Sequence, residues 1–242
     1  MVNVAIIHTI LGIIGNFTSF IRLASPLPTI IRHQKKKSVE KFKYHPYIAA
    51  IINCFLWVFY SMPFVHPHRI PVTTVNGLGL IMNLAFLITY MIYTNNTKRA
   101  AITVYLSAEF LILALLSTVT LLVFHGHTTR SNFVGIFCDI FGIAFYGAPL
   151  VAMRNVIETK SVEFMPLSLS LTGFVNGIVW SAYSILRFDL YLLINNGFGA
   201  IISTLQLILY AIYYKSTPKE GQNLSQVQPS SGRSLQLATA GV

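Results

Sequence analysis

The chain contains seven runs of about 20 mostly apolar residues, and this pattern constrains the fold more than any other feature. A run of roughly 18 or more apolar residues is long enough to cross the hydrocarbon core of a bilayer as a helix. Helices are required there because lipid offers no partner to free backbone N–H and C=O groups. We expect membrane spans at residues 5–28, 46–65, 71–93, 100–124, 131–153, 166–187 and 190–213.

The composition excludes the two main alternatives to a membrane protein. Charged residues make up 10% of the chain, whereas soluble domains carry about 25%. With 54% hydrophobic residues, the chain is also too apolar to remain disordered in water. Only residues 214–242, which are rich in Gln, Ser and Gly, have the composition of a disordered tail.

The net charge of +10 is distributed unevenly across the predicted spans. Thirteen Lys and Arg residues lie in the loops after the first, third and fifth spans and in the tail, whereas only Arg69, Arg130 and Arg187 lie on the opposite side. Basic residues concentrate on the cytosolic side of membrane proteins. We therefore expect the N-terminus outside and the tail in the cytosol, and no binding of nucleic acid.

The chain also repeats itself. The tetrapeptide Lys-Ser-Val-Glu at 37–40 recurs at 160–163, an offset of 123, and at the same offset Trp57, one of two tryptophans, matches Trp180, the other. In the third span of each half the offset becomes 120, and Asn76 matches Asn196. Internal repeats of this length indicate a duplicated structural unit.

The repeat defines the expected fold class: an all-α membrane protein with two parallel three-helix repeats, 5–93 and 131–213, joined by a linker helix at 100–124. The linker restores the direction of the chain, so both repeats start on the same side of the membrane. Parallel repeats of this kind are typical of transporters, which bind their substrate near the membrane midplane between the repeats.

The duplicated motifs resemble the SWEET family of sugar transporters, in the form found in plants. The resemblance rests on residues 24–28, 37–40, 53–57 and 75–79 in the first half, and 146–150, 160–166, 195–199 and 205–210 in the second. It implies bidirectional, facilitative transport of mono- or disaccharides by alternating access, with no enzymatic activity, no cofactor and no metal, in the plasma membrane. The oligomeric state, homo- or hetero-oligomer, is left open.

Neutral amides and aromatic rings from both halves suit a sugar. Asparagine offers donors and an acceptor to hydroxyl groups without a charge, and tryptophan offers a flat wall to the C–H faces of the ring. By their matching depth, Asn76, Asn196, Trp57 and Trp180 are expected to form the binding pocket, as the resemblance also implies. The alternatives are asparagines that join helices and tryptophans at the membrane interface.

A second asparagine pair extends this pocket. Asn53 and Asn176 lie four residues before the tryptophans, one turn away on the same helix face. Relatives that favour sucrose tend to carry a smaller residue at these positions, so the resemblance implies a preference for hexoses such as glucose.

The resemblance also implies the gating residues. Pro26, Pro46, Pro149 and Pro166 match a proline tetrad that acts as hinges at the cytosolic side. A proline removes a helical hydrogen bond and creates a bending point, although each could instead simply mark a helix boundary. On the outer side, the family's closing pair corresponds to Tyr60 and Asp189.

Two charges within the spans depart from this scheme. Arg22 is expected to pair with Asp139 or to reach the interface, and otherwise to influence the choice of substrate. Asp139 offers the alternative of a proton-coupled sugar symporter. A seven-helix receptor is the more remote alternative, and the internal repeat argues against it.

Overall fold

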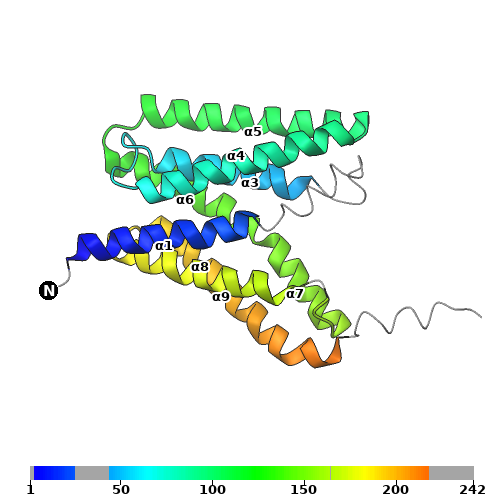
Figure 1. The fold of residues 1–242 in the computed structure, drawn as a ribbon. Coiled ribbons are helices and arrows are strands. Elements are labelled where there is room, and N and C mark those ends of the chain that lie inside the picture. Colours follow the sequence, from blue (N-terminus) through cyan, green and yellow to red (C-terminus); the bar gives the residue numbers. More distant parts are fainter. Residues whose placement is uncertain (1–2, 25–43, 164, 218–242) are drawn as a thin grey trace, which may run out of the picture.

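A computed structural model describes residues 3–24, 44–163 and 165–217. Within these ranges the chain is helical and has no strand. Pro26, the motif at 37–40 and residues 218–242 of the predicted tail lie outside the described residues. Figure 1 labels the helices α1 (Val4–Ala24), α3 (His45–Tyr60), α4 (Ile70–Tyr93), α5 (Asn96–Leu122), α6 (His127–Phe145), α7 (Gly147–Thr159), α8 (Leu167–Ile185) and α9 (Leu190–Tyr213), and the 3₁₀ turn η1 (Tyr214–Ser216) follows α9.

The described helices follow the seven predicted spans, with α6 and α7 sharing the fifth. Five spans, α1, α4, α5, α6 with α7, and the helix that begins with α9, are long and apolar enough to cross a membrane. The helix α3 is shorter, at 16 residues. The helix α8 is less apolar because serines and asparagine interrupt its sequence.

Two span boundaries differ from the sequence prediction for local reasons. The helix α3 ends at Tyr60 rather than at 65, because Pro63 has no N–H to continue the helical ladder. The helix α5 begins at Asn96 rather than at 100, because the side chain of Asn95 accepts a hydrogen bond from the backbone N–H of Lys98 at 2.9 Å and caps the helix.

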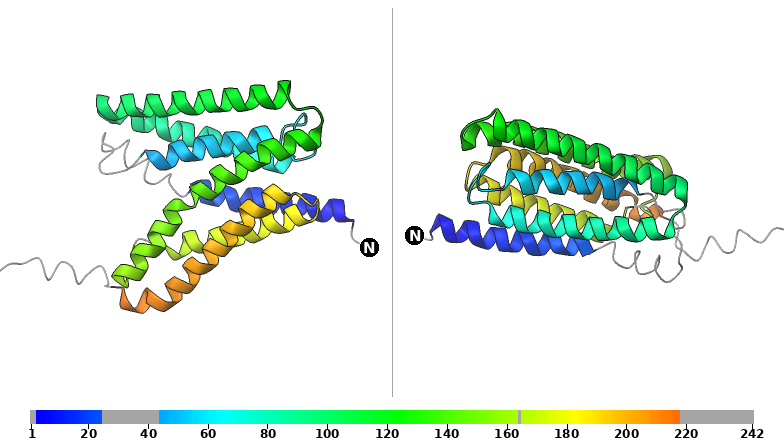
Figure 2. Two further views of the ribbon diagram at one scale, coloured as in Figure 1. Left: turned by 180° about the vertical axis from the view of Figure 1, so that it is seen from behind. Right: turned by 90° about the horizontal axis from the view of Figure 1, so that it is seen from above.

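The two halves use the same helix pairings. In the first half α4 packs against α1 and α3, and in the second half α9 packs against α6 and α8. Between the halves, the first helix of each packs against the second helix of the other, α1 with α8 and α3 with α6. The helix α5 lies outside this arrangement, along one side of the molecule (Figures 1 and 2). This exchange of partners is the arrangement that a pseudo-twofold axis between two copies requires.

The fifth span is broken at Tyr146, between α6 and α7. Pro149 explains the break, because it has no N–H to donate to the carbonyl of Phe145, four residues earlier. By contrast, Pro46 lies in the first turn of α3 and Pro166 is the N-cap of α8. Neither costs a helical hydrogen bond there, so the helix bending that was expected of these two prolines is not seen.

The outer surface of the helices is apolar. Phe110 and Leu111 of α5 are 75% and 69% exposed, and Ile81 of α4 is 67% exposed. Isolated apolar residues on a soluble surface would be ordinary, but here they recur along whole helix faces. Such faces suit contact with lipid, as expected of a multi-pass membrane protein.

Candidate functional site

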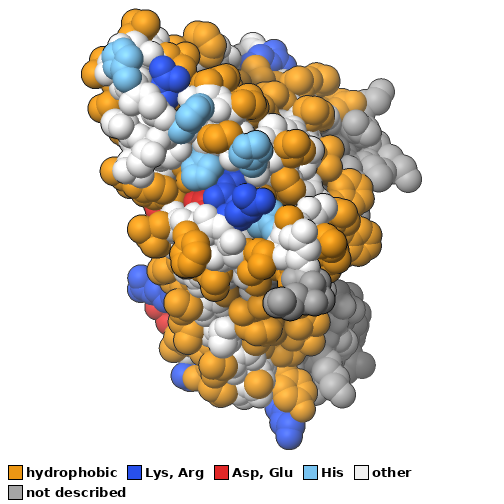
Figure 3. Space-filling view, turned by 90° about the vertical axis from the view of Figure 1, so that its left-hand side faces the viewer, with side chains coloured by type: hydrophobic (Ala, Val, Ile, Leu, Met, Phe, Trp, Pro, Cys, Tyr) orange, Lys and Arg blue, Asp and Glu red, His pale blue; other side chains and the backbone are white. Residues whose placement is uncertain are grey.

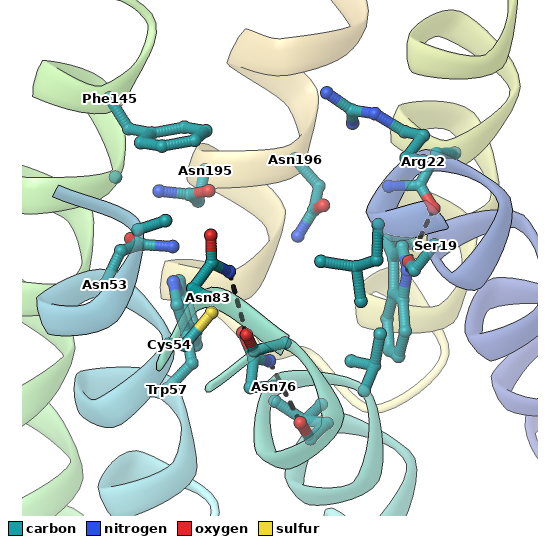
Figure 4. A pocket seen from close by; sticks show the side chains of 18 of the residues that line it. Ser19, Arg22, Asn53, Cys54, Trp57, Asn76, Asn83, Phe145, Asn195 and Asn196 are labelled. Atoms are coloured by element: carbon teal, nitrogen blue, oxygen red, sulfur yellow. Dashed lines mark hydrogen bonds between the residues drawn. The ribbon is translucent and has the colours of Figure 1, made fainter. Parts of the chain in front are cut away.

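A cavity of about 350 Å³ lies between the two halves. It is lined by all six residues predicted to bind the substrate: Asn53, Trp57, Asn76, Asn176, Trp180 and Asn196. Figure 4 labels Asn53, Trp57, Asn76 and Asn196 among them. Along α3 it extends from Trp57 to Pro46, and along α8 from Trp180 to Leu169. At 1.5 Å per helical residue each of these distances is about 16 Å. We call this cavity the central pocket.

Asn76 and Asn196 have the same geometry in the two halves. The Nδ2 of Asn76 donates to the carbonyl of Val72 at 2.9 Å, and the Nδ2 of Asn196 donates to the carbonyl of Leu192 at 2.9 Å. Neither amide hydrogen-bonds to a described residue of another helix, which argues against the alternative of helix-joining asparagines. Each Oδ1 therefore remains able to accept a hydrogen bond from a hydroxyl group in the central pocket.

The tryptophans are buried, which argues against the alternative of an interfacial position. Trp57 is 4% and Trp180 is 3% exposed. Each ring also meets a tyrosine three residues later edge-on: Trp57 and Tyr60 have ring centroids 5.4 Å apart, and Trp180 and Tyr183 have ring centroids 5.2 Å apart. The two halves thus present equivalent aromatic walls at the same end of the central pocket.

Asn53 and Asn176 differ in their partners. The Oδ1 of Asn176 accepts hydrogen bonds from Thr18 at 2.9 Å and from Ser19 at 2.7 Å, and Ser19 Oγ in turn accepts one from Trp180 Nε1 at 3.1 Å. The Oδ1 of Asn53 is buried and has no hydrogen-bond partner among the described residues. Sequence reasoning missed Thr18 and Ser19, because hydroxyl residues in an apolar span give no signal of which helix they face.

Arg22, for which an influence on the choice of substrate was one alternative, also lines the central pocket. So do Asn83, Phe145 and Asn195, which were not predicted as site residues. The expected pairing of Arg22 with Asp139 is not found, since neither forms an ion pair with a described residue. The side chain of Asp139 is buried, and its Oδ1 has no hydrogen-bond partner within the described ranges. Asp139 is not among the residues that line the central pocket.

The end of the molecule at which α1 begins is closed by side chains from both halves. The hydroxyl of Tyr60 donates to Asp189 Oδ1 at 2.9 Å, so the predicted pair is in direct contact. Arg69 Nε lies 3.1 Å from Asp189 Oδ2 as an ion pair. Asp189 is also the N-cap of α9 and accepts from the N–H of Leu192 at 3.2 Å. The carboxylate is fully buried.

Arg69 was not predicted as a site residue, although the sequence contained a signal. It is one of three basic residues on the side where such residues are expected to be scarce, and it immediately precedes α4. With 5% exposure it is buried rather than a loop residue in water.

His66 completes this group, which we call the closing cluster: Tyr60, His66, Arg69 and Asp189. His66 Nε2 lies 4.0 Å from Asp189 Oδ2 and its ring lies 5.0 Å from that of Tyr60. Burial, aided by the charges of Arg69 and His127, lowers the pKa of His66, and Asp189 only partly opposes this. Figure 3 views this end, where histidines and basic side chains gather among apolar ones.

The closing cluster lies between two cavities. Trp57 and Leu192 line the central pocket. Tyr60, His66 and Asp189 line a second cavity of about 450 Å³ at the closed end. The cluster is thus the partition between the central pocket and the surface at this end.

Two pseudosymmetric helical halves, a polar pocket between them and an ion pair that joins them at one end define a membrane transporter. The chain matches the model of a family described as sugar efflux transporter for intercellular exchange, at residues 9–98 and 132–218. The match leaves out most of α5. The chain belongs to this family, the SWEET transporters.

Individual relatives agree with this assignment. The bidirectional sugar transporter SWEET4 of Arabidopsis thaliana is 44% identical over 241 residues, covering 100% of this chain and 96% of the relative. SWEET4 of Oryza sativa subsp. japonica is 46% identical over 217 residues, covering 90% and 84%. The structure of a eukaryotic SWEET transporter superposes with a TM-score of 0.84 at 33% identity, covering 88% of this chain and 99% of that one.

Proposed function

We propose that this chain is a bidirectional, facilitative transporter of sugars, and that the central pocket binds the sugar. The observation that carries the proposal is the matched pair of halves, each of which supplies one tryptophan and one asparagine with a free carbonyl oxygen: Trp57 and Asn76, Trp180 and Asn196. Transport of this kind needs neither a cofactor nor ATP, and it makes the protein a uniporter rather than an enzyme.

The chemistry of the pocket suits a neutral, hydroxyl-rich ring. Hydroxyl groups of the sugar donate to the free Oδ1 atoms of Asn76 and Asn196, and the C–H faces of the ring pack against Trp57 and Trp180. Because the lining asparagines are uncharged, the sugar exchanges water for amides without a large desolvation cost. We expect the affinity for the sugar to be modest, because these contacts replace hydrogen bonds that the sugar also makes with water. A modest affinity allows the sugar to be released on either side of the membrane.

The two repeats, residues 5–93 and 131–213, are proposed to rock against one another around the pocket, with 100–124 as the linker. Opening at the closed end separates Tyr60 and Arg69 in the first half from Asp189 in the second. At the other end, the break at Pro149 allows α7 to move relative to α6, while Pro46 and Pro166 set the points where α3 and α8 begin. Pro26 is proposed to act as a hinge in the same movement.

A preference for hexoses is proposed from the size of the pocket. Its volume of about 350 Å³ lies near the lower limit for small-molecule sites. Asn53 and Asn176 both occupy space in it. A monosaccharide therefore fits better than a disaccharide.

The orientation follows from the charge distribution. We place the closed end and the N-terminus outside the cell and residues 214–242 in the cytosol. We place the protein in the plasma membrane, where lipid covers the apolar helix faces. The exposed surface is compatible with homo- or hetero-oligomers.

Uptake and efflux of radiolabelled glucose and sucrose in a transporter-deficient yeast test the proposal. Saturable glucose flux in both directions that persists with a proton uncoupler is the expected result. Flux that stops with the uncoupler would instead favour the symporter, for which the supporting observation is the buried side chain of Asp139, whose Oδ1 accepts no hydrogen bond from a described residue. No flux of either sugar would overturn the proposal.

A further inference from the structure

The central pocket contains a cation that a neutral sugar does not require. Arg22 lies on α1, one turn after Ser19, and its guanidinium carbon is 4.0 Å from the position that a Cβ atom would occupy at Gly173 of α8. In Figure 4 the side chain extends from α1 towards α9, which carries Asn196. The guanidinium thus lies next to the backbone of α8.

Within the described part of the chain this charge has no partner. No described residue forms an ion pair or a hydrogen bond with Arg22. The described residues that line the pocket include no Asp or Glu, and besides Arg22 itself their polar side-chain groups are amides, hydroxyls, indole N–H groups and a thiol. A half-buried cation within a membrane protein is costly and indicates function, and here five N–H donors remain available to a ligand.

Arg22 also breaks the symmetry of the pocket. At the repeat offset of 123 its equivalent is Phe145, which lines the opposite side (Figure 4). The asparagines and tryptophans are the same in the two halves and form a symmetric site for hydroxyl groups. Arg22 adds a cationic group on one side of this site, and Phe145 adds an aromatic ring on the other. A ligand that uses both groups has an anionic end and an apolar ring face.

We propose that the central pocket accepts a hexuronate, a hexose that carries a carboxylate in place of its terminal hydroxymethyl group, with the carboxylate on Arg22. The inference rests on the proposed function and specifies its substrate class. A planar guanidinium binds a carboxylate through two parallel hydrogen bonds, and the remaining hydroxyl groups use the same asparagines as glucose.

The charge balance favours a carboxylate over a phosphate. One guanidinium neutralises one negative charge, and no second cation lies among the described lining residues. A sugar phosphate carries about two negative charges near neutral pH. Its second charge would face the free carbonyl oxygens of Asn76 and Asn196, which repel it.

Counterflow of radiolabelled glucose and glucuronate in proteoliposomes tests the inference, with glucose 6-phosphate as a third arm. The unmodified protein is expected to exchange glucose and glucuronate and to exclude the phosphate. Because a lone hexuronate carries charge, a potassium diffusion potential, positive inside, should increase net glucuronate uptake and leave glucose uptake unchanged.

The Arg22→Leu variant is expected to raise the ratio of the KM for glucuronate to that for glucose about tenfold or more, as the loss of a hydrogen bond to a charged group predicts. Arg22→Lys, which keeps the charge without the planar fork, should raise the ratio less. Arg154→Leu is the matched control, since it removes an exposed arginine on α7, and should leave the ratio unchanged.

The experiment distinguishes a failure of the hexuronate inference from a failure of the proposed sugar transport. Glucose flux without glucuronate flux, an unchanged ratio in Arg22→Leu, or faster flux of the phosphate would overturn the hexuronate inference and leave the sugar transporter intact. No flux of glucose or glucuronate in the unmodified protein would overturn both.

Discussion

The carboxylate of Asp189 accepts a hydrogen bond from the hydroxyl of Tyr60 at 2.9 Å across 129 residues of sequence, and thereby joins the two halves of the transporter at one end. The same carboxylate caps α9 and forms an ion pair with Arg69. The buried side chain of Asp189 therefore caps a helix, neutralises Arg69 and holds the two halves together at the closed end.

Removing the charge of Asp189 tests the closing cluster. In Asp189→Asn the amide still caps α9, but Arg69 is left buried without a counter-ion, a loss of about 3 kcal/mol or more. We expect a lower thermal unfolding temperature in detergent. The double variant Asp189→Asn with Arg69→Gln should recover much of the loss. Equal losses in the single and double variants would show that the ion pair does not stabilise the closed end.

Acid is expected to open the closing cluster through His66. Burial lowers the pKa of His66 below its usual 6.5 in the closed form, and exposure to water on opening returns it towards that value. Protons therefore bind preferentially to the open form. Acrylamide quenching of the two tryptophans behind the cluster should rise as the pH falls below about 6.5. His66→Gln should flatten this profile, and an unchanged profile would contradict the assignment.

The break in the fifth span predicts a transport phenotype. Pro149→Ala restores an N–H that can donate to the carbonyl of Phe145, which favours a continuous helix over α6 and α7. We expect slower transport without a loss of thermal stability. Pro166→Ala is the control, because this proline caps α8 and bends no helix. Faster transport in Pro149→Ala would exclude the break as a hinge.

Pocket size predicts substrate size. Replacing Asn53 and Asn176 together by serine enlarges the central pocket, and the ratio of sucrose to glucose flux should rise about tenfold. The matched control is Asn155→Ser, on the exposed side of α7. An unchanged ratio would mean that these two asparagines do not limit the size of the sugar.

The fold was predictable because each span is a long apolar segment and because the repeat offset aligns Trp57 with Trp180. The pairing of α1 with α8 and of α3 with α6 was not, since hydropathy does not indicate which face of a helix meets which neighbour. The six pocket residues were found because they recur in both halves.

Residues without a repeat equivalent of the same type were missed or misread. Arg69 lies in a loop by sequence but is buried against Asp189, and only the folded chain brings them together. Arg22 was expected to pair with Asp139 or to reach the interface, but it forms no ion pair with Asp139 and lines the central pocket instead. Pro46 and Pro166 lie at the starts of α3 and α8, close to the predicted span boundaries, whereas Pro149 lies inside the fifth span and interrupts it.

The most direct test of the account is glucose counterflow in proteoliposomes that contain Asn76→Ala or Asn196→Ala, with Asn155→Ala as the control. If the central pocket binds the sugar between equivalent halves, each pocket variant loses most of its counterflow, to a similar extent, while all three proteins unfold at similar temperatures. Normal counterflow in both pocket variants would contradict the account, because the sugar would then cross by a route that does not use these asparagines.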